Sequence, residues 1–229
     1  MTGRFGIIGY PVSHSLSPEL FSAAYGGRYA YDLIEAASFG EARERFTDRY
    51  RAVNVTMPFK EEAAAAADVR SAEVERTGAA NILVRTKEGI IARNSDYLAV
   101  RSILRELLAS PGGPLLSVAV IGTGGAGKAA KAAAEDEGFD VEFLHHGDIA
   151  SGLDADLIIY TCPRACEGTG KLRCRVLLES NYKDPCLRGV DAVYIPGTEW
   201  LVRQAVEGYE LMTGEKPDFE ALRHFSFGK

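Results

Sequence analysis

The chain has 229 residues, enough for one large domain or two small ones with a hydrophobic core. Its formal net charge of -6 argues against a dedicated binder of nucleic acid or of anionic membranes. No apolar run reaches the roughly 18 residues that a membrane-spanning helix needs, and no signal-peptide pattern precedes the first strand. We therefore expect a cytoplasmic protein without a nucleic-acid or membrane partner.

The first half of the sequence alternates short strand-like and helix-like segments. Strands are predicted at 5–8, 30–34 and 52–56, helices at 39–50 and 61–67, and a hairpin at 81–84 and 90–93 followed by a helix at 97–108. Another helix is predicted to begin at Ser17-Pro18-Glu19, with Ser17 as its N-cap and Pro18 at its first position.

The second half begins after the clearest linker of the chain, Ser110-Pro111-Gly112-Gly113-Pro114. Residues 115–121 form a continuous apolar run, which is typical of a strand covered on both faces of a parallel sheet. Further strands are predicted at 141–144, 157–160 and 176–178. This rhythm indicates a doubly wound sheet, although 149–156 is too short for a full crossover helix.

A lysine at the end of a strand is the first candidate for catalysis. The run Asn54-Val55-Thr56-Met57-Pro58-Phe59-Lys60 ends a Val-rich strand, and Pro58 disfavours helix for Met57. Lys60 is thus expected in a strand-end turn near the Thr56 hydroxyl and the Asn54 amide, a placement that suits proton transfer. The alternative is a lysine that only forms a surface salt bridge.

A glycine loop follows the apolar run at 115–121. Gly122-Thr123-Gly124-Gly125-Ala126-Gly127-Lys128 fits G-x-G-x-x-G between a predicted strand and a predicted helix, a context that favours dinucleotide binding. The loop also fits part of a nucleotide-triphosphate P-loop, but Ala129 stands where a Ser or Thr would hold magnesium. A turn that binds nothing is the other alternative.

The end of the next strand should select the dinucleotide, because an acid there binds ribose hydroxyls and an arginine favours a 2′-phosphate. This chain has Leu144-His145-His146-Gly147-Asp148. A protonated His146 suits a phosphate and Asp148 suits a hydroxyl, so the choice between NADP and NAD stays open.

The four cysteines, Cys162, Cys166, Cys174 and Cys186, lack CxxC spacing, and no histidine lies among them. We expect reduced thiols and no metal site.

Together these motifs resemble the shikimate dehydrogenases, in a short form, and the resemblance runs nearly from end to end. Its segments are Gly9 to Pro18, Asn54 to Lys60 (NVTxPFK), Gly78 to Asn81 (GAxN), Arg93 to Asp96 (G-x-NTD) and Glu179 to Tyr182 (D-x-x-Y). Six positions depart from the family pattern: Ser95 for Thr, Tyr97 for Gly, Trp200 for Met, and His145-His146-Gly147 for Asn-Arg-Thr.

The resemblance implies a role for each matching residue. Lys60 and Asp96 would be the catalytic pair. Substrate would be bound by Ser15 and Ser17, at its carboxylate, and by Thr56, Asn81, Tyr182 and Gln204. The cofactor would be bound by Gly122, Gly124, Gly125, Ala126, Gly127, His145, His146 and, against the nicotinamide amide, Gly197.

The resemblance also implies an α/β fold of two lobes. A small α/β substrate-binding domain would comprise 1–98 and 204–229, and a Rossmann-like dinucleotide-binding domain 99–203. The expected activity is the reversible NADP(H)-dependent reduction of 3-dehydroshikimate to shikimate in aromatic amino-acid biosynthesis, by a monomer or homodimer. Two alternatives are an NAD-dependent quinate/shikimate dehydrogenase and a non-catalytic shikimate-binding protein.

Overall fold

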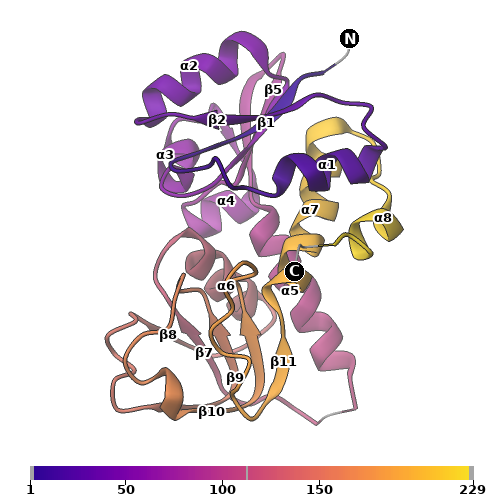
Figure 1. Ribbon diagram of the computed structural model, residues 1–229. Helices are drawn as coiled ribbons and strands as arrows, with labels where there is room; N and C mark the ends of the chain where they lie inside the picture. The colour runs from indigo at the N-terminus through magenta and orange to yellow at the C-terminus, as the bar shows by residue number, and fades with distance from the viewer. Residues whose placement is uncertain (1–2, 112, 227–229) are drawn as a thin grey trace. The chain divides into compact units, whose positions relative to one another are not determined.

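The computed structural model describes residues 3–111 and 113–226, which fold into two compact units (Figure 1). The first unit comprises Met1–Ser95 and Gln204–Lys229, and the second comprises Asp96–Arg203. The chain passes from one unit to the other within helix α5 (Ser95–Ala109) and again within helix α7 (Gly197–Thr213). The α/β fold class expected from the sequence is confirmed. The assignment of substrate and dinucleotide binding to separate domains stays a prediction.

The first unit is built on a six-stranded mixed sheet with the strand order β2-β1-β3-β5-β6-β4. Its strands are β1 (Phe5–Gly9), β2 (Tyr31–Glu35), β3 (Ala52–Val55), β4 (Val69–Arg70), β5 (Ile82–Thr86) and β6 (Gly89–Arg93). Strand β1 lies between β2 and β3, is fully buried and pairs in parallel with both neighbours. The segments that follow β1 and β3 therefore leave the sheet at the same edge.

Helices cover both faces of this sheet. They are α1 (Ser17–Tyr25), α2 (Phe39–Arg49), α3 (Lys60–Ala65), α4 (Ala72–Thr77) and α8 (Phe219–Arg223). One face packs around residues of α2, α3 and α4, such as Phe46 and Ala63. On the other face the Phe21 ring meets the Tyr31 and Tyr209 rings at centroid distances of 4.6 and 4.7 Å. Tyr209 belongs to α7, so the end of the chain completes the core of the first unit.

The expectation that Ser17 caps α1 is wrong. Ser17 is the first residue of the helix, the N-cap is Leu16, and no side chain caps the helix there. Helix α2 shows the usual arrangement, because Ser38 accepts a hydrogen bond from the backbone amide of Glu41 at 3.3 Å. The short elements β4 and α4 were also absent from the expected segments.

The second unit contains a five-stranded sheet in which all strands are parallel, with the order β11-β10-β9-β7-β8. The strands are β7 (Val118–Ile121), β8 (Val141–Leu144), β9 (Leu153–Tyr160), β10 (Leu172–Glu179) and β11 (Val193–Ile195). Strand β7 lies between β8 and β9, so the direction of winding reverses beside it. In open α/β sheets ligands bind at such a switch point, outside the carboxyl ends of the strands.

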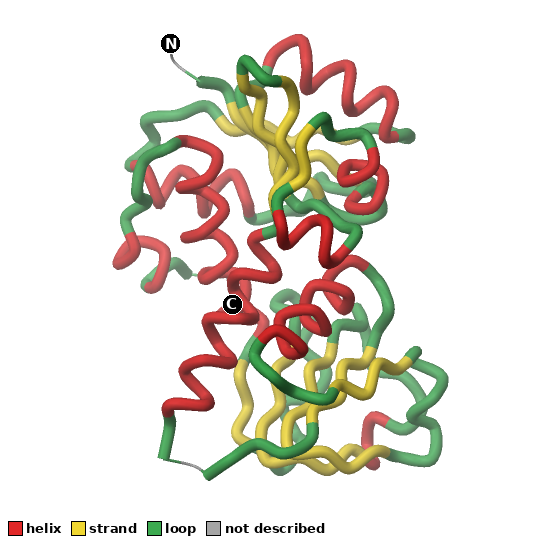
Figure 2. The backbone as a smooth tube through the Cα atoms, turned by 180° about the vertical axis from the view of Figure 1, so that it is seen from behind, coloured by secondary structure: helices red, strands yellow, loops and turns green. Residues whose placement is uncertain are grey.

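The two faces of this sheet are covered differently, as can be followed in Figure 2. Residues of α5, of α6 (Gly125–Asp136) and Trp200 of α7 share a core with one face. The opposite face packs against loop residues such as Ile149 and Leu187. Among the described residues, the connections after β8, β9 and β10 hold no α-helix, only the 3-10 turn Thr169–Lys171. The strand order expected of a doubly wound sheet is present, but helices cover one face alone.

Within the described part of the chain, no helix combines the length and the apolar character needed to cross a lipid bilayer.

Candidate active site and dinucleotide loop

The loop after β1 places two serine hydroxyls at the start of α1. The loop is held by Glu35, whose Oε2 accepts the backbone amides of Val12 and Ser13 at 2.8 and 3.1 Å. The Ser15 hydroxyl donates to the Ser17 hydroxyl at 3.0 Å and accepts the Ser17 amide at 3.3 Å. Hydroxyls beside the exposed amides of a helix N-terminus suit an anion such as a carboxylate.

The segment after β3 is tied to the loop after β1 by backbone contacts. The Thr56 amide donates to the carbonyl of Ile8 at 2.9 Å, and the Tyr10 amide donates to the carbonyl of Met57 at 3.1 Å. A Cβ on Gly9 would lie 2.4 Å from Cγ2 of Thr56, so this approach requires glycine. The structure therefore brings the serine loop and the Thr56 segment together at one edge of the sheet.

Lys60 is half-buried and is the first residue of α3. We expected Lys60 in a strand-end turn before a helix that begins at residue 61. The helix begins one residue earlier, at Lys60 itself. The Lys60 carbonyl accepts the amide of Ala80 at 2.8 Å, which fastens the lysine to the turn that carries Asn81.

Three polar side chains meet beneath this edge. The Asn81 Nδ2 donates to the Ser95 hydroxyl at 3.0 Å and to Oε1 of Gln204 at 3.5 Å. The Ser95 amide donates to Oδ1 of Asn81 at 2.8 Å, and its hydroxyl donates to Gln204 at 3.2 Å. Asn81 and Gln204, both expected to bind substrate, are thus brought together. Asn81 also holds the start of α5 in place through its bonds to Ser95. The sequence did not predict that Ser95 would bond to both amides.

Tyr31 is a further candidate for this site, and sequence reasoning did not find it. Its hydroxyl donates to Oδ1 of Asn54 at 2.7 Å. Burial raises the pKa of Tyr31 well above its usual value, the nearby Tyr209 adds to this effect, and a hydrogen bond with Ser17 opposes it. Tyr31 is therefore a neutral donor to Asn54 of β3. Only the fold reveals it, because a tyrosine on an edge strand carries no distinctive pattern.

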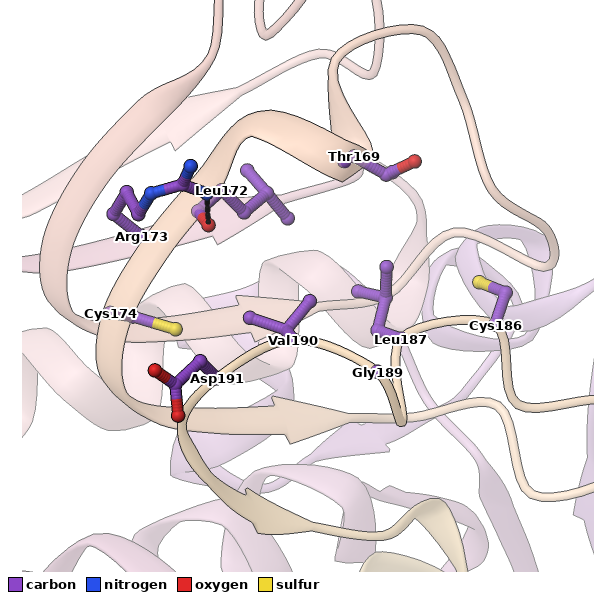
Figure 3. Close-up of a pocket in the computed structure, with 10 residues that line it drawn as sticks. Thr169, Leu172, Arg173, Cys174, Cys186, Leu187, Gly189, Val190 and Asp191 are labelled. Carbon is purple, nitrogen blue, oxygen red and sulfur yellow. Dashed lines mark hydrogen bonds between the residues drawn. The ribbon is translucent and has the colours of Figure 1, made fainter.

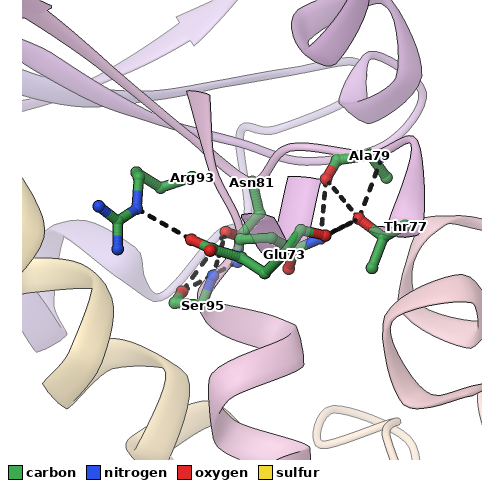
Figure 4. Close-up of polar contacts among 7 residues, drawn as sticks. Glu73, Thr77, Ala79, Asn81, Arg93 and Ser95 are labelled. Carbon is green, nitrogen blue, oxygen red and sulfur yellow. Dashed lines mark hydrogen bonds and ion pairs between the residues drawn. The ribbon is translucent and has the colours of Figure 1, made fainter. Parts of the chain in front are cut away.

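A partly buried ion pair supports the turn that leads into α5 (Figure 4). The Arg93 Nε donates to Oε1 of Glu73 at 2.9 Å, and the Glu73 side chain is 9% exposed. Burial alone would raise the pKa of Glu73, but hydrogen bonds to its carboxylate and the charge of Arg93 hold that pKa below its ordinary value. The side-chain Nδ2 of Asn94 donates to the Ala79 carbonyl at 2.8 Å, which joins this turn to the one before Asn81.

Asp96, the second candidate for catalysis, is buried in the first turn of α5. We expected Asp96 in a turn after β6, ahead of a helix that begins at residue 97. Helix α5 begins two residues earlier, at Ser95, and therefore includes Asp96. The indole Nε1 of Trp200 donates to Oδ1 of Asp96 at 3.1 Å. Asp96 belongs to the second unit and Lys60 to the first, and their pairing stays a prediction.

The glycine loop of the second unit has the geometry that the dinucleotide motif requires. Gly122 has φ +105°, which only glycine adopts readily, and a Cβ on Gly127 would lie 1.8 Å from the Gly122 carbonyl oxygen. A Cβ on the exposed Gly124 would meet no atom within 4 Å. The first and third glycines are thus needed by the turn and by packing, whereas Gly124 leaves open space for a ligand at the N-terminus of α6. Gly125 and Ala126 form the first turn of α6.

The end of β8 carries two exposed imidazoles. The His145 and His146 ring centroids lie 3.9 Å apart. The Asp148 carboxylate accepts the His145 backbone amide at 2.7 Å, so it is turned back onto its own loop.

Two further candidate residues lie near the carboxyl end of β10: Tyr182 follows this strand in the chain, and Gly197 is the first residue of α7 and packs against Ser180 and Asn181. A Cβ on Gly197 would lie 2.7 Å from the Ser180 carbonyl oxygen, so glycine lets the start of α7 pack closely on the end of this strand. That packing alone explains why glycine occupies position 197, whether or not a cofactor binds there. The expected contact of Gly197 with the nicotinamide stays a prediction. Burial raises the pKa of the half-buried Tyr182.

A separate cavity of about 610 Å³ lies on the loop-covered face of the second sheet (Figure 3). Its lining includes Arg173, Asp191 and the thiols of Cys174 and Cys186. Burial, with a further contribution from Asp154, raises the pKa of Cys174 to about 11. Burial and a hydrogen bond to Glu179 raise that of Cys186 to about 12. Protonated thiols are poor nucleophiles and poor metal ligands. No group of three or more His, Cys, Asp or Glu suited to a metal ion occurs among residues 3–111 and 113–226.

A parallel sheet with a glycine loop at its switch point, joined to a mixed α/β unit, is the architecture of two-domain dinucleotide-binding proteins. The family model for the shikimate dehydrogenase substrate binding domain matches residues 7–83. The chain is 30% identical to the shikimate dehydrogenase (NADP(+)) of Aeropyrum pernix over 236 residues, covering 90% of this chain and 83% of that protein. The chain belongs to the shikimate dehydrogenase family.

Other relatives match over a shorter stretch. The shikimate dehydrogenase (NADP(+)) of Thermus thermophilus is 35% identical over 145 residues, covering 60% of this chain and 53% of that protein. The chain thus spans about half the length of several curated relatives that it matches. The crystal structure of Mycobacterium tuberculosis shikimate dehydrogenase superimposes with a TM-score of 0.78 at 27% identity, covering 96% of this chain and 97% of that one.

The Glu73–Arg93 pair predicts a pH-dependent stability. Because the folded pKa of Glu73 is lowered, its contribution is full above the unfolded pKa and is lost as the pH falls through the folded pKa. Glu73→Gln should lower the free energy of unfolding by about 1 kcal/mol at pH 7. The difference should shrink below about pH 4.5.

Urea unfolding at several pH values measures this difference. Glu75→Gln is the matched control, because the Glu75–Arg70 pair on the same helix is exposed and should contribute little. A Glu73→Gln deficit that stays constant down to pH 3 would contradict the role given to the ionised carboxylate.

The glycine loop predicts opposite behaviour for two similar substitutions. Gly127→Ala should cost about 1–3 kcal/mol of stability or more, because its Cβ would overlap the Gly122 carbonyl. Gly124→Ala should change stability by less than about 1 kcal/mol yet weaken dinucleotide binding, because its Cβ would occupy the open space. Thermal unfolding and dinucleotide titration followed by calorimetry measure the two effects. Equal binding by Gly124→Ala and the parent chain would refute a dinucleotide at this position.

Proposed function

We propose that the chain is an NADP(H)-dependent shikimate dehydrogenase that reversibly reduces 3-dehydroshikimate to shikimate. The observation that carries the proposal is the convergence of polar groups from four segments of the first unit. The serine loop and the Thr56 segment share a sheet edge, and Asn81 is bonded to Gln204. The names of the relatives, shikimate dehydrogenase (NADP(+)), support the same reaction.

The polar groups of the first unit match the substrate chemically. Shikimate carries one carboxylate and three hydroxyls. Ser15 and Ser17 at the start of α1 are the proposed carboxylate ligands. The Thr56 hydroxyl and the Asn81 and Gln204 amides can each donate or accept a hydrogen bond, and they are the proposed ligands of the hydroxyls. Tyr182, from the second unit, is the proposed contact where substrate and cofactor meet.

Lys60 and Asp96 are the proposed proton-transfer pair. Reduction of a ketone places negative charge on its oxygen, which requires a nearby cation and a proton donor. An ammonium group such as that of Lys60 supplies both, and Asp96 is its proposed partner. The nicotinamide supplies the hydride when it is bound, and the protein supplies position and protons.

The second unit is the proposed dinucleotide site. The open space at Gly124 and the start of α6 suit a pyrophosphate, and Gly197 is proposed to face the nicotinamide amide. Because the Asp148 carboxylate is bonded to the His145 amide, the imidazoles of His145 and His146 are proposed to meet the 2′-phosphate of NADP. We further propose a cytoplasmic monomer or homodimer with a role in aromatic amino-acid biosynthesis, without nucleic-acid or membrane partners.

Shikimate oxidation followed at 340 nm tests the activity, with NADP and NAD compared and with quinate as a second substrate. Lys60→Ala should lower kcat by about 100- to 10,000-fold, because it removes the general acid-base group. Lys87→Ala, an exposed lysine in the β5–β6 turn, is the control and should keep full activity. Near-native turnover by Lys60→Ala would refute the mechanism. Shikimate binding without any change at 340 nm would identify a non-catalytic binding protein instead.

The imidazoles at the end of β8 predict a change of cofactor preference. His145→Ala combined with His146→Ala should raise KM for NADP while leaving KM for NAD nearly unchanged, because only NADP carries the 2′-phosphate. The ratio of kcat/KM for the two cofactors measures this preference. His224→Ala, an exposed histidine beyond α8, is the control. An unchanged ratio in the double variant would exclude the two histidines as the phosphate contact.

A further inference from the structure

Trp200 is the one tryptophan of the chain, and it is buried beside Asp96. Its exposed fraction is 3%, and it shares the core formed by α5, α6 and one face of the second sheet. The indole Nε1 donates to Oδ1 of Asp96 at 3.1 Å. The two residues are 104 positions apart, so the contact exists only because α7 packs beside α5 within the second unit.

This hydrogen bond constrains both partners. A buried indole N–H needs an acceptor, and Asp96, itself only 8% exposed, provides a carboxylate. Hydrogen bonds to an ionised group are stronger than those between neutral groups and have a tighter geometry. Packing on all sides fixes the indole, so the indole in turn fixes the direction of Oδ1. A methionine at this position would offer no donor.

The first turn of α7 also contacts the carboxyl end of β10. Gly197, three residues before Trp200, packs so closely on the Ser180–Asn181 backbone that a Cβ would lie 2.7 Å from each residue. The same helical turn thus touches the strand end where a dinucleotide is expected and holds the Asp96 carboxylate. The position of Asp96 is therefore set relative to that end of the sheet.

We propose that Trp200 is the positioning residue for Asp96, holding the carboxylate through its indole N–H in the orientation that proton transfer requires. The proposal rests on the proposed function, which makes Asp96 catalytic. Trp200 need not touch the substrate in this role. Its effect passes through a single hydrogen bond, and the rest of the indole serves only to pack.

The hydrogen bond can be tested without any activity assay. A chain with one tryptophan gives one indole cross-peak in a ¹H–¹⁵N correlation spectrum. Asp96→Ala should move that indole proton upfield, because the charged acceptor is lost. Asp136→Asn is the matched control, because Asp136 is bonded to Tyr97, the neighbour of Asp96, and not to Trp200. An indole proton whose chemical shift is the same in Asp96→Ala as in the parent chain would overturn the proposal.

The functional consequence can be tested by replacing the indole with an isostere. Biosynthetic incorporation of benzothienylalanine changes this residue alone and substitutes sulfur for the N–H at nearly constant shape. We expect kcat for shikimate oxidation to fall about ten- to hundredfold. We expect the melting temperature to stay within about 3 °C. Trp200→His, which retains an N–H donor in a smaller ring, is a second variant whose partial recovery of kcat would support the role of the donor.

The possible outcomes separate the two proposals. A kcat within twofold of the parent chain in the benzothienylalanine protein would overturn the role of Trp200 while leaving the dehydrogenase assignment intact. A parent chain that oxidises no substrate with either cofactor would overturn the proposed function and the positioning role with it, even if the indole peak still reports the bond to Asp96.

Discussion

Asn81 joins three segments of the first unit that are distant in the sequence. It bonds to Ser95 at the start of α5 and to Gln204 in α7, while its backbone carbonyl accepts the amide of Val55 at 2.7 Å. Asn81 is 4% exposed, so an unpaired donor or acceptor there would cost about 1–3 kcal/mol. The network must therefore form completely, and the proposed substrate ligands depend on it for their positions.

Local patterns in the sequence were sufficient for much of this architecture. The apolar alternation and turn residues identified β1, β3, the β5–β6 hairpin, α2 and the glycine loop, because each depends on neighbouring residues. The exact starts of α3 and α5 were missed by one or two residues, since helix ends depend on tertiary packing. Strand β4 has two residues and β11 three, too few for any periodicity to show.

The contacts that organise the candidate site were harder to foresee. The bonds from Tyr31 to Asn54, from Asn81 to Gln204 and from Trp200 to Asp96 span 23, 123 and 104 positions. No local propensity encodes such separations. The candidate site residues could be chosen from motifs in the sequence. Their hydrogen-bond partners could be identified only from the structure.

On the loop-covered face of the second sheet, buried hydrogen bonds hold loops where other α/β sheets have packed helices. Glu179 at the end of β10 has no exposed surface, yet its carboxylate accepts the Cys186 amide at 2.7 Å and the Tyr194 hydroxyl at 2.6 Å. A buried carboxylate is costly unless it is fully hydrogen-bonded. Here the Glu179 carboxylate fixes the loop after β10 and the strand β11 against the sheet. In a fully wound α/β sheet a crossover helix would cover this face instead.

The division of the chain has a consequence for the order in which it folds during synthesis. The second unit is one continuous stretch, Asp96–Arg203, and leaves the ribosome complete before the first unit can close. The first unit waits for its last segment, because the Tyr209 ring completes the aromatic cluster around Phe21. The face of the first sheet around Phe21 is thus covered only when the end of the chain has been made, and until then it is exposed to chaperones or to misfolding.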